Sequence, residues 1–559
     1  MGELLVVVGA LLVIAAAAVL GPRLRVAAPL MLVLIGVGAS FLPVFDSVAI
    51  NPELILAGVL PPLLYSSAVS MPTMNFRREF GAISGLSVLL VLASSLLLGL
   101  FFVVAIPDLG FAWGVALGAV VSPTDAVATS IIKQTPVSKR VVAMLDGESL
   151  LNDPTALVLL RTSIAAAAVS FSVWRTLGTF VYSVVVAVIV GWAVGRGNLL
   201  VRRRVTDPTV NTVISFTVPF VASIPAEAIG ASGLVAAVIA GLVTGIRAPR
   251  DLSPRNRLSD SQNWRTVELV LEGAVFLTMG VQIKSIVTDV EDHHAGVGTA
   301  VLVAVGALVL TVVVRAAYIA PLLAALGAKS RRYVGMQDRL EDMQVKMQSD
   351  DGRQATLDEL NTRPGRTLKE SDLDRFSVRV TRGLADIEYF RRQPLGWRDG
   401  TVVVWAGMRG AVTVAAAQTL PADTPQRPVL VLVAFAVALL SLVVQGGTIG
   451  PLVRWISRGD EGTDAEQAAS DQAQSEQARI FDLLREASEQ IPEPPGVHDQ
   501  SRAGFAASRS HRLAVLGAQR TALLDARDNG TFDADVLESA LANLDASEIA
   551  IELRGKMVT

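Results

Sequence analysis

The chain contains no cysteine, and only four of its 559 residues are histidines. Without cysteine it can form no disulfide bond, no cysteine-ligated zinc site and no iron–sulfur cluster. None of the histidines lies inside an apolar run, and the polar segments have neither a phosphate-binding glycine loop nor a clustered basic face for nucleic acid. We therefore expect no cofactor and no nucleic-acid partner.

Charged residues are also scarce, at 18% of the chain, whereas 52% of the residues are hydrophobic. This balance is typical of polytopic membrane proteins and not of soluble enzymes, so membrane lipid is the expected surrounding of most of the chain. The first apolar segment follows Met1-Gly2-Glu3 without a basic region. That start favours a membrane span over a signal peptide.

Apolar runs long enough to cross about 30 Å of hydrocarbon, about 20 residues each, recur along the chain. They predict an all-α fold with thirteen membrane spans. The approximate ranges are 3–20, 27–43, 51–70, 81–106, 112–133, 139–166, 172–198, 209–224, 229–247, 264–288, 297–327, 400–420 and 427–457.

Lysine and arginine alternate between the loops that join these spans. Basic residues gather in the odd-numbered loops, for example Arg77 and Arg78 in the third, with exceptions at Arg161, Arg175 and Arg427. Cytoplasmic loops carry the excess of positive charge in membrane proteins. The pattern therefore predicts an external N-terminus and a cytoplasmic C-terminus.

Two predicted spans contain residues that interrupt a helix. The fifth contains Ser122-Pro123-Thr124-Asp125 and the twelfth contains Gly407-Met408-Arg409-Gly410. Proline lacks a backbone donor and glycine disfavours helix, so both spans should be broken. Seven spans separate the two breaks, an odd number, so spans 1–6 and 8–13 must be inverted if they are repeats. Paired broken helices in inverted halves indicate a transporter's binding site near the bilayer midplane.

The charged residues divide the chain into membrane and soluble parts. We predict a membrane transport domain in two parts, 1–328 and 397–457, with a cytoplasmic helical insert at 329–396 and a cytoplasmic tail at 458–559. The tail opens with a linker rich in Ala, Gln and Glu, and its later pattern indicates short helices. A regulatory or assembly domain and a solvated appendage are both open interpretations of the tail.

The sixth predicted span carries four polar residues in a stretch that should lie in lipid. Glu148 and Asn152 are four residues apart, as are Ser149 and Asp153, so at helical spacing these groups share one flank. A charge at the bilayer centre costs several kcal/mol, so ionisable residues there indicate a functional site. Glu272, in the tenth span, is a weaker candidate of the same kind.

Five short motifs add a family resemblance to this reading. They are Leu-Pro-Pro-Leu-Leu at 60–64, Ser-Pro-Thr-Asp at 122–125, Gly-Glu-Ser-Leu-Leu-Asn-Asp at 147–153, Gly-Met-Arg-Gly-Ala at 407–411 and Gln-Gly-Gly-Thr at 445–448. Together they resemble the monovalent cation:proton antiporter-1 family, which includes bacterial NhaP-type sodium/proton antiporters. The resemblance spans the whole membrane region. It implies a homodimer in the bacterial cytoplasmic (inner) membrane.

The resemblance also implies roles for individual residues. The family's ion-binding aspartate matches Asp153, with Asn152 beside it and Ser149 one turn earlier. The broken helix of the fifth span contributes Thr124, with Asp125 next to it. The resemblance thus implies a cation and proton site at these five residues, with Na+ held by Asp153, Ser149 and Thr124.

Three further residues match positions to which the family assigns supporting roles. Glu148 matches a glutamate that pairs with an arginine in the eleventh span, here Arg315. Such a buried pair is expected to hold helices together rather than to transport ions. Arg409 matches an arginine that stabilises the broken twelfth span or responds to pH. The chain departs from the family at Tyr65-Ser66-Ser67, where many members carry an acid, so coupling should rest on Asp153 nearly alone.

These residues lead to a functional hypothesis with several alternatives. A carboxylate in lipid binds either a proton or a cation, which is sufficient for electroneutral exchange of cytoplasmic Na+ or Li+ for an external proton. A K+/H+ antiporter would use the same fold. An intramembrane aspartyl protease is disfavoured, because the sequence lacks the Gly-x-Gly-Asp element that such enzymes carry. A cation channel is disfavoured because the sequence has no filter-like repeat of loops and no ring of acids.

Overall fold

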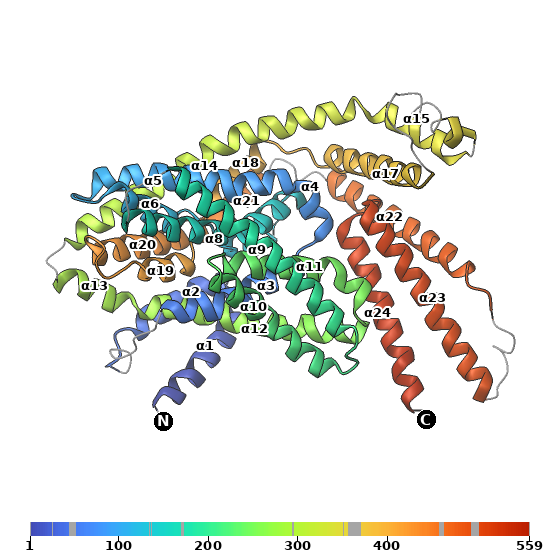
Figure 1. Ribbon diagram of the computed structural model, residues 1–559, viewed down its shortest axis with the longest axis horizontal. Helices are drawn as coiled ribbons and strands as arrows, with labels where there is room; N and C mark the ends of the chain where they lie inside the picture. The colour runs from blue at the N-terminus through green and yellow to red at the C-terminus, as the bar shows by residue number, and fades with distance from the viewer. Residues whose placement is uncertain are drawn as a thin grey trace. The chain divides into compact units, whose positions relative to one another are not determined.

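A computed structural model describes residues 2–24, 26–43, 52–133, 135, 137–168, 173–292, 296–349, 351–355, 370–457, 463–493 and 502–557. These described residues contain helices and no strand (Figure 1). The chain forms two compact units, the first from residues 1–322 with 397–458 and the second from residues 323–396 with 459–559.

The first unit carries most of the helices. They are α1 (Gly2–Leu24), α2 (Ala28–Ala39), α3 (Leu60–Ser70), α4 (Thr73–Ser84), α5 (Val91–Ala105), α6 (Phe111–Val121), α7 (Val127–Ile132), α8 (Lys139–Ala168), α9 (Val173–Arg202), α10 (Pro208–Ala228), α11 (Gly233–Asp251), α12 (Pro254–Val281), α13 (Ile283–Asp292), α18 (Trp397–Trp405), α19 (Ala411–Gln418), α20 (Arg427–Ser441) and α21 (Gly447–Ser457). Short π-helical turns continue three of them: η2 (Leu54–Val59), η3 (Gly85–Leu90) and η4 (Leu442–Gly446). Helix α14 (Val297–Val334) begins in this unit.

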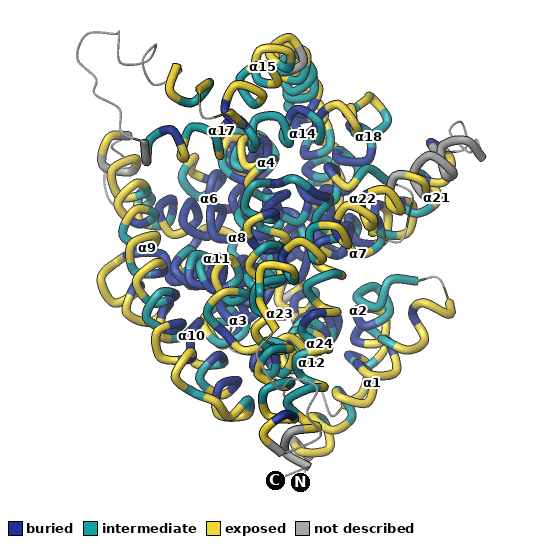
Figure 2. The backbone as a smooth tube through the Cα atoms, turned by 90° about the vertical axis from the view of Figure 1, so that its right-hand side faces the viewer, coloured by how far each residue is buried: buried dark blue, intermediate teal, exposed yellow. Residues whose placement is uncertain are grey.

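Eight helices among the described residues are long and apolar enough to cross a membrane. They are Leu4–Leu24, Thr73–Ala105, Leu177–Arg202, Pro208–Ala228, Gly233–Asp251, Pro254–Glu291, Val297–Tyr333 and Arg427–Ile456. Helix α8 has 30 residues but is not one of the eight, because its sequence includes several charged residues. It is buried among its neighbours, together with α6 and α11, whereas α1 and α9 expose much of their surface (Figure 2).

Both helix interruptions predicted from the sequence are present. Helix α6 ends at Val121 and α7 begins at Val127, so residues 122–126 are not helical. Helix α18 ends at Trp405 and α19 begins at Ala411, so residues 406–410 are not helical. Proline and glycine explain these positions, because neither residue favours a helix interior.

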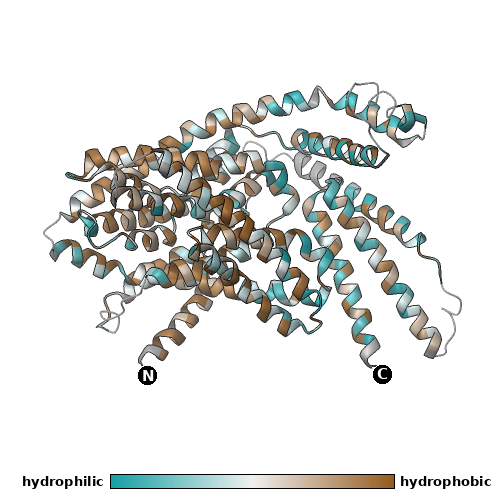
Figure 3. Ribbon diagram, viewed as in Figure 1, coloured by the Kyte–Doolittle hydropathy of each residue, from teal (hydrophilic) through white to brown (hydrophobic). Residues whose placement is uncertain are grey.

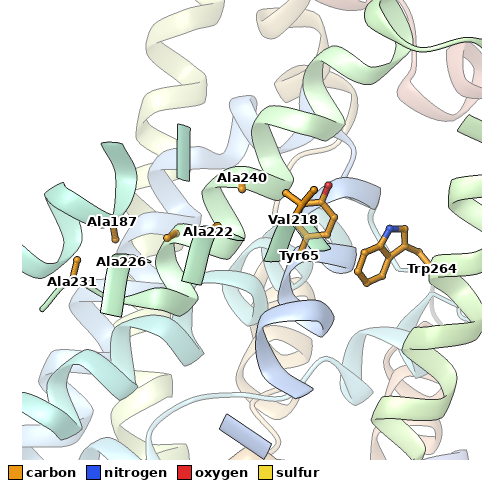
Figure 4. Close-up of a cluster of buried hydrophobic side chains, with 9 residues drawn as sticks. Tyr65, Ala187, Val218, Ala222, Ala226, Ala231, Ala240 and Trp264 are labelled. Carbon is orange, nitrogen blue, oxygen red and sulfur yellow. The ribbon is translucent and has the colours of Figure 1, made fainter. Parts of the chain in front are cut away.

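A hydrophobic cluster joins α3, α9, α10, α11 and α12. Small residues such as Ala222 and Ala240 let the helices approach closely, and two aromatic side chains link α3 to α12 (Figure 4). The rings of Tyr65 and Trp264 lie 5.2 Å apart, and Trp264 Nε1 donates to Ser215 Oγ at 2.9 Å. This cluster fixes α12 beside α3, which matters because both helices line the cavity described below.

The second unit combines the insert with the tail. Its helices are α15 (Gln337–Gln348), α17 (Glu370–Arg392), α22 (Thr463–Glu489), α23 (Arg502–Asn529) and α24 (Ala534–Met557). They alternate hydrophilic and hydrophobic residues, unlike the largely hydrophobic first unit (Figure 3). The tail helices share a core that includes Leu523 and Leu537. The predicted linker and short helices are therefore wrong, because Ala, Gln and Glu at the start of α22 favour helix and the apolar stripes are long.

Candidate ion-binding site

A cavity of about 120 Å³ lies where α3, α8, α12 and the two helix breaks meet. This volume is enough for a cation with several water molecules. Its polar lining residues are Ser67, Thr124, Asp125, Ser149, Asp153, Glu268, Glu272 and Thr413. Among the described residues that line it there are four carboxylates and no basic side chain. The cavity is therefore suited to a cation.

Helix α8 directs its polar residues to two different places. Ser149 and Asp153 line the large cavity, whereas Glu148 and Asn152 line a second, smaller cavity of about 10 Å³. Each pair shares a face because its members are four residues apart, but the two faces differ by about 100° around the helix. The single polar flank expected from the sequence is therefore two flanks with different neighbours.

Asp153 lies in the large cavity without a protein partner. Its carboxylate makes no hydrogen bond or ion pair with any residue that the structure describes. Ser149, one turn earlier, donates from Oγ to the carbonyl oxygen of Asp146 at 3.1 Å, which leaves the oxygen lone pairs of its hydroxyl available. Asp153 is thus a desolvated carboxylate that can lose its charge only by binding a proton or a cation.

The two helix breaks hold Asp125 in place. Its backbone nitrogen donates to the carbonyl oxygen of Met408 at 2.7 Å, which joins one break directly to the other. Its Oδ1 accepts from the backbone nitrogen of Val127 at 3.1 Å, at the start of α7. Gly410 packs against the same carboxyl group, so that a β-carbon at residue 410 would overlap it.

A buried ion pair lies on the other face of α8. Arg315 of α14 donates from Nη1 and Nη2 to the two carboxylate oxygens of Glu148, the second at 2.7 Å, and from Nε to the carbonyl oxygen of Val403 at 2.8 Å. Both side chains are about 2% to 3% exposed. Each of the three guanidinium nitrogens of Arg315 thus makes one hydrogen bond, and the pair connects α8, α14 and α18.

Thr124 lines the large cavity and makes hydrogen bonds to two residues that line the smaller one. Its Oγ1 donates to Glu148 Oε1 at 3.0 Å and accepts from Asn152 Nδ2 at 2.7 Å. Asn152 also donates to the Thr124 carbonyl oxygen at 2.9 Å. The structure thus places Asn152 against the helix break and not on the large cavity, where Thr124 is present.

Arg409 occupies the end of the half-helix α6. Its Nε donates to the carbonyl oxygen of Val121 at 3.0 Å and its Nη2 to that of Ser122 at 3.3 Å. These carbonyl groups have no partner within the helix, which ends there. A buried cation at the carboxyl end of a helix also compensates the helix dipole.

Two carboxylates of the large cavity were not expected as site residues. Glu268 is not among the residues predicted from the sequence, and Glu272 is predicted there only as a weaker candidate, yet both line the cavity from α12. Ser66 of α3 donates from Oγ to Glu268 Oε2 at 3.4 Å. Asp153 is therefore one of four carboxylates that line the cavity, and not nearly the only one as the sequence predicts. Glu268 and Glu272 are four residues apart within an apolar run, and this spacing is the sequence signal that they share one face of the helix.

Comparisons with known proteins also indicate a protein that exchanges cations for protons. The family model described as the transmembrane sodium/hydrogen exchanger matches residues 7–340 and 376–455. An uncharacterised Na+/H+ exchanger of Mycobacterium tuberculosis is 27% identical over 585 residues, which cover 98% of this chain and 96% of that protein. A Bacillus subtilis sodium, potassium, lithium and rubidium/H+ antiporter is 29% identical over 276 residues, which cover 48% of this chain and 41% of that protein.

Among solved structures, the chain resembles the sodium proton antiporter MjNhaP1 of Methanocaldococcus jannaschii at pH 8. The TM-score is 0.54 with 15% sequence identity, and the match covers 82% of this chain and 99% of the other. At this identity the likeness concerns the fold.

Proposed function

Because the chain belongs to the sodium/hydrogen exchanger family, we propose that it exchanges cytoplasmic Na+ or Li+ for an external proton. It is a multi-pass membrane transporter and not an enzyme, and the exchange needs no cofactor. The observation that carries the proposal is the unpartnered carboxylate of Asp153 in a cavity that also contains Ser149 and Thr124. Its role would be to maintain cellular pH and sodium.

Competition at Asp153 is the proposed mechanism. The proton and the cation each neutralise the same carboxylate, so only one of them is bound at a time. A neutralised site crosses between the two sides of the membrane readily, whereas an empty, charged site does not. Alternating access with this restriction exchanges one cation for one proton, which is electroneutral.

The ligands of the cation are proposed from the oxygens that face the cavity. Na+ and Li+ are hard cations that prefer oxygen donors. Asp153, Ser149 and Thr124 supply a carboxylate and two hydroxyl groups, and water can complete the shell. Asp125 adds negative charge to the same space, and its contact with Val127 ties it to the half-helix α7.

The remaining residues of the proposed site act through position. Glu148 and Arg315 tie three helices together, and Asn152 holds the carbonyl and hydroxyl groups of Thr124. Arg409 stabilises the broken helices. A response to pH would follow if protonation of the carboxylates in the large cavity changed the contacts of Arg409 with these helices. These roles rest on the hydrogen bonds described above.

We further propose thirteen membrane spans in two inverted repeats of six, in a bacterial cytoplasmic (inner) membrane. This proposal is supported by the overlap of each of the thirteen apolar ranges with a helix, and by the backbone hydrogen bond from Asp125 to Met408 that joins the two breaks. An external N-terminus and cytoplasmic insert and tail follow from the alternation of basic loops. Homodimeric assembly is part of the same proposal, as is a regulatory function of the tail, whose helices have their own core.

Potassium is the second candidate cation. The Bacillus subtilis relative is named for sodium, potassium, lithium and rubidium exchange, and oxygen ligands bind all four ions. A K+/H+ antiporter would use the same carboxylate with a wider arrangement of ligands.

The test is exchange in proteoliposomes with a series of Na+, Li+ and K+ gradients. We expect cation-driven proton movement without net charge transfer, and its complete loss in Asp153→Asn, because an amide takes up no proton at neutral pH and carries no negative charge to neutralise the cation. The variant should keep the wild-type melting temperature, since Asp153 has no protein partner to lose. Normal exchange by Asp153→Asn would overturn the site, and the relative rates would rank the three cations.

A further inference from the structure

Glu272 is the second carboxylate of the large cavity that has no protein partner. No hydrogen bond or ion pair joins it to any residue in the described part of the chain. Its neighbour Glu268 differs, because Ser66 Oγ donates to it. A carboxylate that is largely removed from water and has no partner is unstable as an anion, so it requires a counter-ion or a proton.

The direction of Glu272 is fixed by the packing of α12. Gly273 and Gly280, on an adjacent face of the helix, contact other helices closely. A β-carbon at Gly273 would lie 2.7 Å from Cγ2 of Ile14 in α1, and a β-carbon at Gly280 would lie 2.8 Å from the Cα of Gly36 in α2. Helix α12 therefore cannot rotate without breaking these contacts with α1 and α2. Rotation would also separate Tyr65 from Trp264.

With this rotation fixed, one face of α12 lines the cavity. Glu268, Glu272, Val275 and Phe276 share that face at helical spacing, and all four are lining residues. Asp153 approaches the same space from α8. The two carboxylates without partners thus face one cavity from two separate helices, and no basic side chain lies among its described lining residues.

We propose that Glu272 is a second cation-binding residue, which attracts the monovalent cation into the cavity and holds it there together with Asp153. The inference rests on the proposed exchange at Asp153 and adds a determinant of cation affinity. Asp153 remains the residue at which proton and cation compete, so Glu272 changes how tightly the cation binds and not whether exchange is coupled.

The test measures the KM for Na+ and the maximal rate of proton exchange in proteoliposomes. Glu272→Gln should raise KM about tenfold, because one negative charge near the cation is lost, and should leave the maximal rate within about twofold of wild type. Glu272→Asp should recover most of the affinity, since it restores the charge. Glu268→Gln is the matched control on the same helix face and should have a clearly smaller effect.

Several outcomes would overturn the inference. The first is an unchanged KM in Glu272→Gln. If the maximal rate and the melting temperature also fall at unchanged KM, the role of Glu272 is structural. Equal effects of Glu268→Gln and Glu272→Gln would indicate that only the summed charge of the cavity matters. Wild-type protein without exchange would instead refute the proposed function. Exchange that is lost in Asp153→Asn but has normal affinity in Glu272→Gln would refute this inference alone.

Discussion

Asp153 and Glu148 show how two carboxylates on one helix acquire different tasks. They are five residues apart, so they point to different sides of α8. Glu148 meets the guanidinium group of Arg315 and the hydroxyl of Thr124, whereas Asp153 meets a cavity. A paired carboxylate is stable as an anion and has little to gain from a transported ion. The unpaired one must take its counter-ion from the cavity.

We predict that Glu148→Gln lowers stability more than it changes the exchange mechanism. It leaves the guanidinium group of Arg315 buried without a counter-charge, which should cost about 3–5 kcal/mol. Thermal melting of the purified protein measures the effect. Asp146→Asn is the control on the same helix, because its pair with Lys133 is partly exposed, at 23% and 52%, and should cost less than about 1 kcal/mol. Similar melting curves for the two variants would contradict the prediction.

At the level of helices, the two interruptions depend on each other. The first carries the prolyl break with Asp125, and the second carries Gly410, whose lack of a β-carbon lets this side chain approach. Arg409 closes the arrangement by donating to the carbonyl groups at the end of α6. A helix ending inside a membrane needs such partners, because lipid supplies none.

We predict that Gly410→Ala abolishes exchange. The added β-carbon would overlap the carboxyl group of Asp125, so either this side chain leaves its contact with Val127 or one of the two breaks moves, and both changes alter the cavity wall. Proton exchange in proteoliposomes is the readout. Gly197→Ala is the matched control, because that glycine of α9 has open space around its β-carbon position. Wild-type rates in Gly410→Ala would show that the breaks adjust independently.

In the chain as a whole, segments far apart in sequence form the second unit. Arg392, at the end of α17, donates from Nη1 to Glu476 of α22, and Glu476 also accepts from the backbone nitrogen of Asp533 at 3.0 Å. Glu476 is only 5% exposed. Helix α17 ends shortly before α18, which leads to the second break.

We predict that Glu476→Gln loosens the contact between insert and tail. The amide would leave the positive charge of Arg392 without its buried partner, so amide hydrogen exchange of α17 and α22 should become faster. Asp482→Asn, on the same helix but in an exposed pair with Arg485, should leave those rates unchanged. Equal protection in the wild type and in Glu476→Gln would show that the ion pair does not hold the two segments together.

The family, the membrane character and both helix breaks could be predicted from the sequence. Each depends on local properties: apolar length for a membrane helix, proline and glycine for a break, and a set of short motifs for the family. The family resemblance is confirmed by the match over residues 7–340 and 376–455. Asp153 could likewise be chosen from the sequence, because a carboxylate is costly wherever an apolar run buries it.

Which carboxylates are paired could be decided only by the folded arrangement. Helical spacing places Glu148 and Asp153 on α8, but packing of α14 gives one of them Arg315 and leaves the other free of protein partners. The same holds for Glu272, whose direction depends on glycine contacts between α12 and two distant helices. Periodicity describes a helix relative to its own axis, whereas the surroundings of a side chain are set by neighbours that are remote in sequence.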